Sequence, residues 1–134
     1  MLHEQQNKDV VRAYVEAMNT GDFDRLERLF TKDTNIHGVL GRGSLDIAMP
    51  IWRELHGALD MHLEIEELAA DGDTVVARFR ETGRSVGEFR GLRATGKTYE
   101  IIAIEWFTIR DGLITDRWGV RDSAAQARQI GWQA

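Results

Sequence analysis

The chain of 134 residues contains no cysteine and a single proline, Pro50. Without thiols it cannot form disulfides, thiolate nucleophiles, cysteine-ligated zinc sites or iron–sulfur clusters. The lack of cysteine also fits a reducing compartment, so we expect a cytoplasmic location. No apolar run approaches the roughly 18 residues of a membrane span, and no basic-then-apolar leader pattern opens the sequence. We therefore expect no membrane association.

Positive charge is scarce as well. The 17 Lys and Arg residues are outnumbered by 22 Asp and Glu, which leaves a formal net charge of -5. This balance provides no sequence-wide basic field to attract phosphate backbones, so nucleic acid is not an expected partner. The 4 histidines show no metal-ligand spacing, and the glycines between Gly83 and Gly91 lack nucleotide-loop spacing. Neither a metal site nor a phosphate cradle is expected.

The residues that are present, 43% hydrophobic and 29% charged, are typical of a packed globular protein, and the length fits one domain over residues 1–134. Apolar residues at helical spacing predict helices over 4–19, 23–30 and 45–59. Pro50 predicts either a kink in the third helix or a start near this residue. Alternation with period two predicts strands over 61–66, 74–82, 97–110 and 113–122. A short strand over 31–40 and a C-terminal helix over 123–130 complete the pattern.

This order, helices first and antiparallel strands afterwards, predicts an α+β fold. The expected architecture is a cone-shaped curved antiparallel sheet wrapped over three N-terminal helices. Such a cone encloses a natural pocket for a small molecule, so a hydrophobic small-molecule ligand is the expected partner.

The Asp111-Gly112 pair is a strong hairpin signal that places Arg110 opposite Leu113 and fixes the register behind it. With ideal pairing, Glu105 faces Trp118 and Ile101 faces Asp122. The residues predicted on the inner face are Ile101, Ala103, Glu105, Phe107, Trp118, Val120 and Asp122. The residues predicted on the outer face are Ile102, Ile104, Trp106, Thr108, Arg117 and Arg121.

Two acids, Glu105 and Asp122, thus share an otherwise apolar face. A carboxyl group between apolar walls is disfavoured in its charged form, which suits a general acid or base. The alternatives are structural: Glu105 pairs with an arginine, and Asp122 caps the C-terminal helix through Ser123 and Ala124.

His37, beside Gly38 at a change from strand to loop, is a third candidate, because an imidazole titrates near neutral pH. A structural histidine is an equal alternative. Four aromatic residues on inward faces are predicted to bind substrate or to pack in the core. They are Tyr14, Trp52, Phe107 and Trp118.

Several short segments occur in an order and spacing that together resemble one family. They are Asn19-Thr20-Gly21-Asp22-Phe23-Asp24, His37-Gly38, Gly87-Glu88-Phe89-x-Gly91, Thr95-Gly96-Lys97, Arg110-Asp111-Gly112-Leu113-Ile114, Trp118-x-x-x-Asp122 and Gln129-Ile130-Gly131. Together they resemble the SnoaL-like polyketide cyclases, within the cone-shaped superfamily typified by nuclear transport factor two.

The resemblance implies a curved sheet around an apolar pocket, a homodimer, and no metal or organic cofactor. Cyclases of this family close a ring of a polyketide ester by aldol chemistry, with an acid/base Asp on the last strand, and Asp122 matches that position. Those cyclases pair the Asp with a His on the preceding strand, where this sequence has Glu105.

Our leading hypothesis is therefore a cofactor-independent acid/base enzyme, cyclase- or isomerase-like, that removes a proton alpha to a carbonyl. Asp122 would be the general base, with Glu105 and His37 as second groups. A non-catalytic binding or interaction module with the same fold is the alternative. A third hypothesis, an epoxide hydrolase- or dehydratase-like enzyme, needs two neighbouring carboxylates, whereas Glu105 and Asp122 would lie about 13 Å apart at roughly 3.3 Å per residue.

The outer face carrying Ile102, Ile104 and Trp106 is too apolar to remain exposed to water. A second subunit or the C-terminal segment is expected to cover it, and a homodimer is favoured.

Overall fold

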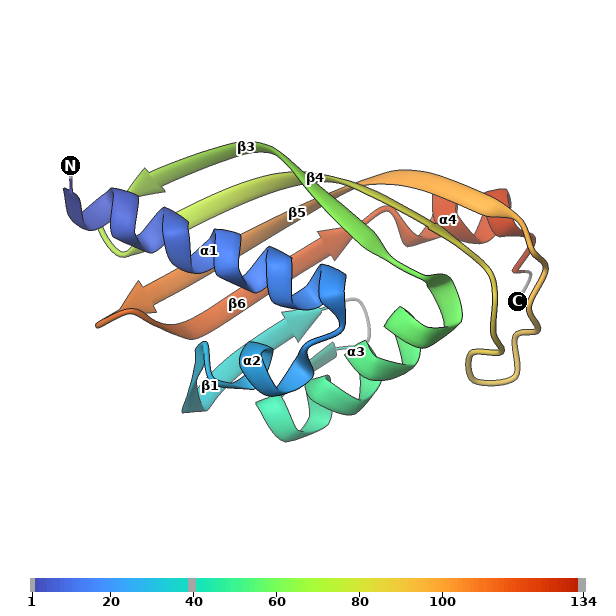
Figure 1. Ribbon diagram of the computed structural model, residues 1–134, viewed down its shortest axis with the longest axis horizontal. Coiled ribbons are helices and arrows are strands. Elements are labelled where there is room, and N and C mark those ends of the chain that lie inside the picture. The colour runs from blue at the N-terminus through green and yellow to red at the C-terminus, as the bar shows by residue number, and fades with distance from the viewer. Residues whose placement is uncertain (1, 39–40, 133–134) are drawn as a thin grey trace.

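A computed structural model describes residues 2–38 and 41–132 (Figure 1). The elements along the chain are α1 (Leu2–Thr20), α2 (Phe23–Glu27), β1 (Phe30–Gly38), β2 (Gly41–Gly43), α3 (Leu45–Leu59), β3 (His62–Asp71), β4 (Thr74–Arg84), β5 (Thr98–Arg110), β6 (Leu113–Arg121) and α4 (Ser123–Ile130). The predicted α+β class is confirmed, and the bounds of α3 and α4 agree with the predicted 45–59 and 123–130. The end of the strand predicted over 31–40 lies outside the described residues.

The strands form one curved, unclosed sheet of six strands in the order β2-β1-β6-β5-β4-β3. Neighbouring strands are antiparallel except β1 and β6, which run parallel. This parallel pair was not predicted from the sequence. After β1 the chain forms α3 and the strands β3 to β5, and only β6 then pairs with β1.

The helices lie at different places on this sheet (Figure 1). Helix α1 covers the inner face with its apolar side, on which Tyr14 is fully buried. Gly21, at φ 70°, turns the chain into α2, and Asp22 caps α2 by accepting a hydrogen bond from Arg25 N at 3.1 Å. Helix α2 is shorter than the predicted 23–30 because Phe30 already belongs to β1.

Helix α3 carries Pro50 in its interior and begins five residues earlier, at Leu45. The alternative that this helix starts near Pro50 is therefore wrong. Helix α3 ends at Leu59, and its C-cap residue Asp60 adopts the left-handed conformation at φ 46°. Helices α1 and α3 both lie on the concave side of the sheet, and residues from both helices line the candidate site.

A bulge in the β5–β6 hairpin changes the predicted faces. The turn pairs Arg110 with Leu113 as expected, but the register then shifts, since Ile109 pairs with Ile114 and Thr108 with Asp116. The extra residue, Thr115, moves every later position of β6 by one place. The predicted pairs of Glu105 with Trp118 and of Ile101 with Asp122 are therefore wrong.

In the observed register Glu105 pairs with Gly119. Arg117 and Arg121 consequently share the inner face with Glu105, and the prediction that they point outward is wrong. Trp118 and Val120 lie on the outer face, where their exposed fractions are 53% and 69%. A one-residue shift exchanges the faces because side chains alternate along a strand.

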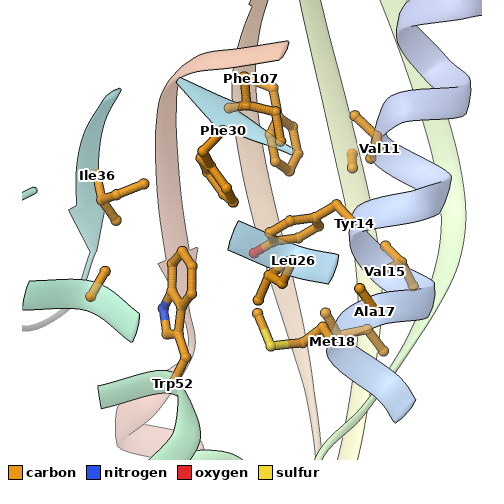
Figure 2. Packing of buried hydrophobic residues seen from close by; sticks show 14 of the residues in the cluster. Val11, Tyr14, Val15, Ala17, Met18, Leu26, Phe30, Ile36, Trp52 and Phe107 are labelled. Carbon is orange, nitrogen blue, oxygen red and sulfur yellow. The ribbon is translucent and has the colours of Figure 1, made fainter. Parts of the chain in front are cut away.

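The main core fills the space between the helices and the inner face of the sheet (Figure 2). Tyr14 reaches from α1 into this core, where its ring makes edge contacts with Phe30, Trp52 and Phe107. On the opposite face of the sheet an apolar surface, here called the outer patch, is exposed. It consists of Ile102, Ile104, Trp106, Trp118 and Val120. None of the helices in the described parts of the chain is long and apolar enough to span a membrane.

Candidate functional site

A pocket opens between α1, α3, the end of the β1–β2 hairpin and the inner face of the sheet. Its empty volume is about 860 Å³, including the open space at its mouth. The residues that line it are Tyr14, Met18, Ile36, Gly38, Gly41, Arg42, Gly43, Ile47, Ala48, Ile51, Trp52, Leu55, Met61, Leu63, Glu81, Glu105, Arg117, Gly119 and Arg121.

The two sides of the pocket differ in chemistry. The helix side is apolar, with Ile51 and Leu55 from α3 and Met18 from α1. The sheet side carries two acids and two arginines from β4, β5 and β6. A ligand in this pocket would therefore meet an apolar surface on one side and hydrogen-bonding groups on the other.

The first polar group, here called the Glu105 cluster, consists of Tyr14, Glu105 and Arg117. Glu105 Oε1 accepts hydrogen bonds from the Tyr14 hydroxyl at 2.7 Å and from Arg117 Nε at 2.9 Å. The side chains of Glu105 and Arg117 are only 4% and 7% exposed. Because both are buried, the ion pair is shielded from solvent and holds its geometry.

Two neighbours fix the position of Arg117. Its guanidinium carbon lies 5.2 Å from the centre of the Trp52 ring, a cation–π contact. On the other side Gly119 makes room: a Cβ there would lie 2.6 Å from the same carbon. Burial lowers the pKa of the Arg117 guanidinium, but the charge of Glu105 and the further interactions with Glu105 and Tyr14 together outweigh burial and raise this pKa above its ordinary value. Arg117 is therefore a permanent cation in the wall.

Burial raises the pKa of the Tyr14 hydroxyl, and the charge of Glu105 adds to this effect while Arg117 opposes it. Tyr14 consequently stays protonated and acts as a hydrogen-bond donor. Its only acceptor among the described residues is Glu105.

The second polar group, here called the Glu81 cluster, consists of Tyr99, Glu81 and Arg121. Arg121 Nε donates to Glu81 Oε1 at 2.8 Å, and Arg121 Nη2 donates to Glu81 Oε2 at 2.5 Å. The Tyr99 hydroxyl also donates to Oε2, at 2.5 Å. Gly83 leaves room for Tyr99, since a Cβ at Gly83 would lie 2.6 Å from the Tyr99 ring. Both oxygens of Glu81 are therefore occupied by protein donors.

Three polar atoms of these clusters have no hydrogen-bond partner among the described residues: Glu105 Oε2, Arg117 Nη2 and Arg121 Nη1. They are not sealed inside the protein. In the described chain the fully buried side-chain atoms without a partner lie elsewhere, on Thr34, His56 and Gln126. The three residues that carry these atoms, one acceptor and two donors, all line the pocket.

Three of the predicted site residues, Glu105, Tyr14 and Trp52, line this pocket. Phe107 is fully buried behind it, with its ring centre 5.1 Å from that of Tyr14. Trp118 points away from the pocket into the outer patch, as the bulge dictates. The structure therefore places two of the four predicted aromatic residues at the pocket surface.

Asp122 and His37 lie outside the residues that line the pocket. Asp122 is exposed and caps α4, accepting a hydrogen bond from Ala125 N at 3.1 Å. This is the capping alternative, although the donor is Ala125 and not Ser123 or Ala124. The His37 ring is stacked on Trp118 with 3.6 Å between ring centres, and its carbonyl oxygen accepts from Arg117 Nη1 at 3.4 Å.

Sequence reasoning missed Glu81, Arg117 and Arg121. Glu81 had a signal: Val75, Ala77 and Phe79 alternate inward along β4, and the next step of two is Glu81. The two arginines were assigned to the wrong face because the bulge at Thr115 leaves no mark in the residue pattern.

The fold is a cone with its pocket on the concave face of the sheet, an architecture that suits the binding of a small molecule inside the domain. No cluster of potential metal ligands occurs among the residues that the structure describes. The SnoaL-like polyketide cyclase family model matches residues 8–130, so the chain belongs to this family, as the sequence resemblance predicted.

Two relatives share about a third of their residues with the chain. Aklanonic acid methyl ester cyclase DnrD of Streptomyces peucetius is 32% identical over 129 residues, covering 92% of this chain and 89% of the relative. The cyclase of the same description, DauD of Streptomyces sp. strain C5, is 30% identical and covers 92% and 80%. A crystal structure of a candidate polyketide cyclase from Xanthomonas campestris pv. campestris aligns with a TM-score of 0.88 at 25% identity, over 96% of this chain and 98% of that one.

Proposed function

We propose that the protein is a cofactor-independent cyclase for a hydrophobic polyketide-like ester, with Glu105 as the group that removes a proton alpha to a carbonyl. The observation that carries this proposal is the asymmetry of the Glu105 carboxylate. Oε1 is fixed by Tyr14 and Arg117, whereas Oε2 has no partner among the described residues, and Glu105 lines the pocket. A base needs this combination of a fixed orientation and an available oxygen.

In the proposed reaction Glu105 Oε2 takes a proton from a carbon next to a carbonyl group. The C–H electron pair forms the enolate, whose oxygen carries the negative charge. The enolate carbon then attacks a second carbonyl carbon of the same molecule, forming the new C–C bond of the ring. The resulting alkoxide takes the proton back from Glu105, so no atom is gained or lost.

The roles of the neighbours follow from their contacts. Arg117 Nη2, which has no protein acceptor among the described residues, is placed to donate to the enolate oxygen. Tyr14 holds Glu105 Oε1 and directs Oε2 into the pocket. A carboxylate is a weak base, so the proposal requires an activated C–H group between two carbonyls.

The resemblance to the family suggests Asp122 as the base, but the geometry of the pocket favours Glu105. The Asp122 side chain is exposed and engaged at the start of α4. Glu105 lies one strand away on the inner face and lines the pocket directly.

The test compares turnover of aklanonic acid methyl ester, the substrate in the names of the two relatives, by chromatography of the cyclised product. Loss of a general base lowers turnover by roughly 10² to 10⁴-fold. We therefore expect Glu105→Gln to lose turnover by this factor while its circular dichroism stays that of the parent. Asp122→Asn is the matched control and should leave turnover unchanged. Retained turnover in Glu105→Gln, or its loss in Asp122→Asn, would contradict the assignment.

A second candidate is a binding module that uses the same pocket without chemistry. It is favoured by the fact that both pocket acids, Glu105 and Glu81, form ion pairs with arginines. This candidate predicts that the parent protein binds the ester and releases it unchanged. The parent assay therefore separates the two functions before any variant is made.

We also propose that the outer patch is the contact surface of a homodimer. Five apolar side chains, two of them tryptophans, are exposed on one continuous face of β5 and β6. Surrounding ion pairs such as Arg80–Glu100 give this face a polar rim, as at known interfaces. Sedimentation velocity should show a dimer for the parent and a monomer for Trp106→Glu. A monomeric parent would contradict this proposal.

A further inference from the structure

Arg121 lies in the same pocket wall as Glu105 but has no part in the proposed proton transfer. We infer that it binds substrate: its Nη1 donates a hydrogen bond to a carbonyl or hydroxyl oxygen at the end of the substrate farther from Arg117. This inference rests on the proposed use of the pocket, and Arg121 would select substrates by the position of this oxygen.

The placement follows from the strand register. Arg117 and Arg121 are on the same face of β6, about 13 Å apart along the strand at roughly 3.3 Å per residue. Glu105 is opposite Gly119, midway between them. The two arginines that carry the available donors, Arg117 and Arg121, therefore flank Glu105 along the sheet. A substrate with oxygens on both sides of its reacting carbon would meet one donor at each end.

The Glu81 cluster holds Arg121 in a fixed orientation. Glu81 accepts two parallel hydrogen bonds from Arg121 Nε and Nη2, and Tyr99 secures the carboxylate from the other side. The side chains of Glu81 and Arg121 are 1% and 11% exposed. A guanidinium held in this bidentate way loses little further freedom when its third nitrogen binds a ligand.

Charge balance indicates which oxygen is recognised. The two arginines of β6 are each paired with a glutamate, Arg117 with Glu105 and Arg121 with Glu81, whereas Arg42 at the rim donates to Asn35 Oδ1. The wall formed by these two ion pairs thus offers hydrogen-bond donors without excess positive charge, which suits a neutral carbonyl or hydroxyl better than a carboxylate or phosphate. The apolar helix side suits the flat body of an aromatic ligand.

The experiment measures the dissociation constants of two rigid probes, 2,6-dihydroxyanthraquinone and 2-hydroxyanthraquinone, by quenching of tryptophan fluorescence. The first probe carries a hydroxyl group at each end of its long axis, and the second lacks one of these two hydroxyl groups. A hydrogen bond from a charged donor is worth about 1.5–3 kcal/mol, so we expect the parent to prefer the first probe by at least roughly tenfold.

The preference should disappear in Glu81→Gln/Arg121→Met, which removes the donor and leaves an acceptor for Tyr99. If the double variant does not fold, Arg121→Lys, which keeps the charge, replaces it. Arg121→Lys should lower the preference for the first probe. Arg42→Met, at the pocket rim, is the matched control and should keep it. A parent without preference, or an Arg121 variant that retains the full preference, overturns the inference.

The outcome is separable from the proposed function. Glu105→Gln should lose turnover of the ester yet keep the preference between the two probes. If Glu105→Gln retains turnover, the proposed base is wrong. The probe preference then still reports on Arg121 alone.

Discussion

The Glu105 and Glu81 clusters contain the same three residue types and lie on the same face of the sheet, yet their hydrogen bonding differs. Glu81 uses both carboxylate oxygens for three hydrogen bonds, whereas Glu105 uses one oxygen for two. The residue types of a buried Tyr–Glu–Arg group therefore do not decide whether the group is functional or structural. The number of carboxylate oxygens left for a ligand makes the distinction.

The difference begins with the way each arginine approaches its acid. Arg121 meets Glu81 with two nitrogens in parallel, a bidentate arrangement. Arg117 meets Glu105 with Nε alone, because its guanidinium is held over Trp52 and beside Gly119. Glu105 Oε2 consequently remains without a partner among the described residues, on a side chain that lines the pocket.

The largest expected effect is a loss of stability, and its size should differ between Glu81→Gln and Glu105→Gln. In Glu81→Gln the new NH₂ group must face a donor from Arg121 or Tyr99, because both oxygens of Glu81 accept. Breaking a buried pair from one side costs about 3–5 kcal/mol, and we expect a loss of this size in urea unfolding. In Glu105→Gln the amide oxygen can keep both hydrogen bonds while the NH₂ faces the pocket, so we expect a smaller loss, roughly 1–3 kcal/mol.

Equal losses of stability in the two glutamine variants would contradict this difference between the clusters. They would mean that Glu105 Oε2 is as tightly engaged as the oxygens of Glu81. The losses of turnover should run in the opposite order to the losses of stability: Glu105→Gln should lose more turnover than Glu81→Gln, since turnover depends on Glu105.

Much of the fold could be predicted from local patterns. The bounds of α3 and α4, and the pairing of Arg110 with Leu113 beside the Asp111-Gly112 turn, all follow from short-range signals. The parallel pairing of β1 with β6 could not be predicted in this way, because it joins segments separated by most of the chain.

The candidate site could be predicted only in part, and the bulge explains why. Glu105, Tyr14 and Trp52 lie on elements whose faces follow from periodicity alone. Arg117, Arg121 and the outward position of Trp118 depend on one extra residue in β6, and such an insertion costs little in local energy.

A smaller loss of stability is expected for Gly119→Ala, because Gly119 leaves room for the Arg117 side chain. In Gly119→Ala the Cβ would lie 2.6 Å from the Arg117 guanidinium carbon, which must move away from Trp52 and Glu105. Overpacking of this kind costs about 1–3 kcal/mol. We expect thermal unfolding to show this loss, accompanied by reduced turnover. The Glu81 cluster should be unaffected.

Gly57→Ala is the matched control for this variant. Gly57 is exposed within α3, and a Cβ there meets no atom within 4 Å. Alanine is favoured over glycine in a helix by roughly 0.5–1 kcal/mol, so this variant should be slightly more stable than the parent. If the two alanine variants behave alike, the space at Gly119 has no special importance for Arg117.

The smallest expected effect is the absence of a signal in a pH titration. The chain contains 2 tyrosines, Tyr14 and Tyr99, one in each cluster. Burial raises the pKa of each hydroxyl above its ordinary value of 10.0, and the neighbouring glutamate adds to the effect. We therefore expect no phenolate absorbance from the folded protein up to and beyond pH ~10, where an exposed tyrosine ionises. Because the folded state retains protons that the unfolded state releases, stability is full below this pH and falls as the pH rises above it. Both tyrosines should then ionise together with the loss of circular dichroism. A tyrosine that titrates reversibly near pH ~10 in the folded protein would show that its cluster opens to water, and Tyr14→Phe and Tyr99→Phe would identify which one.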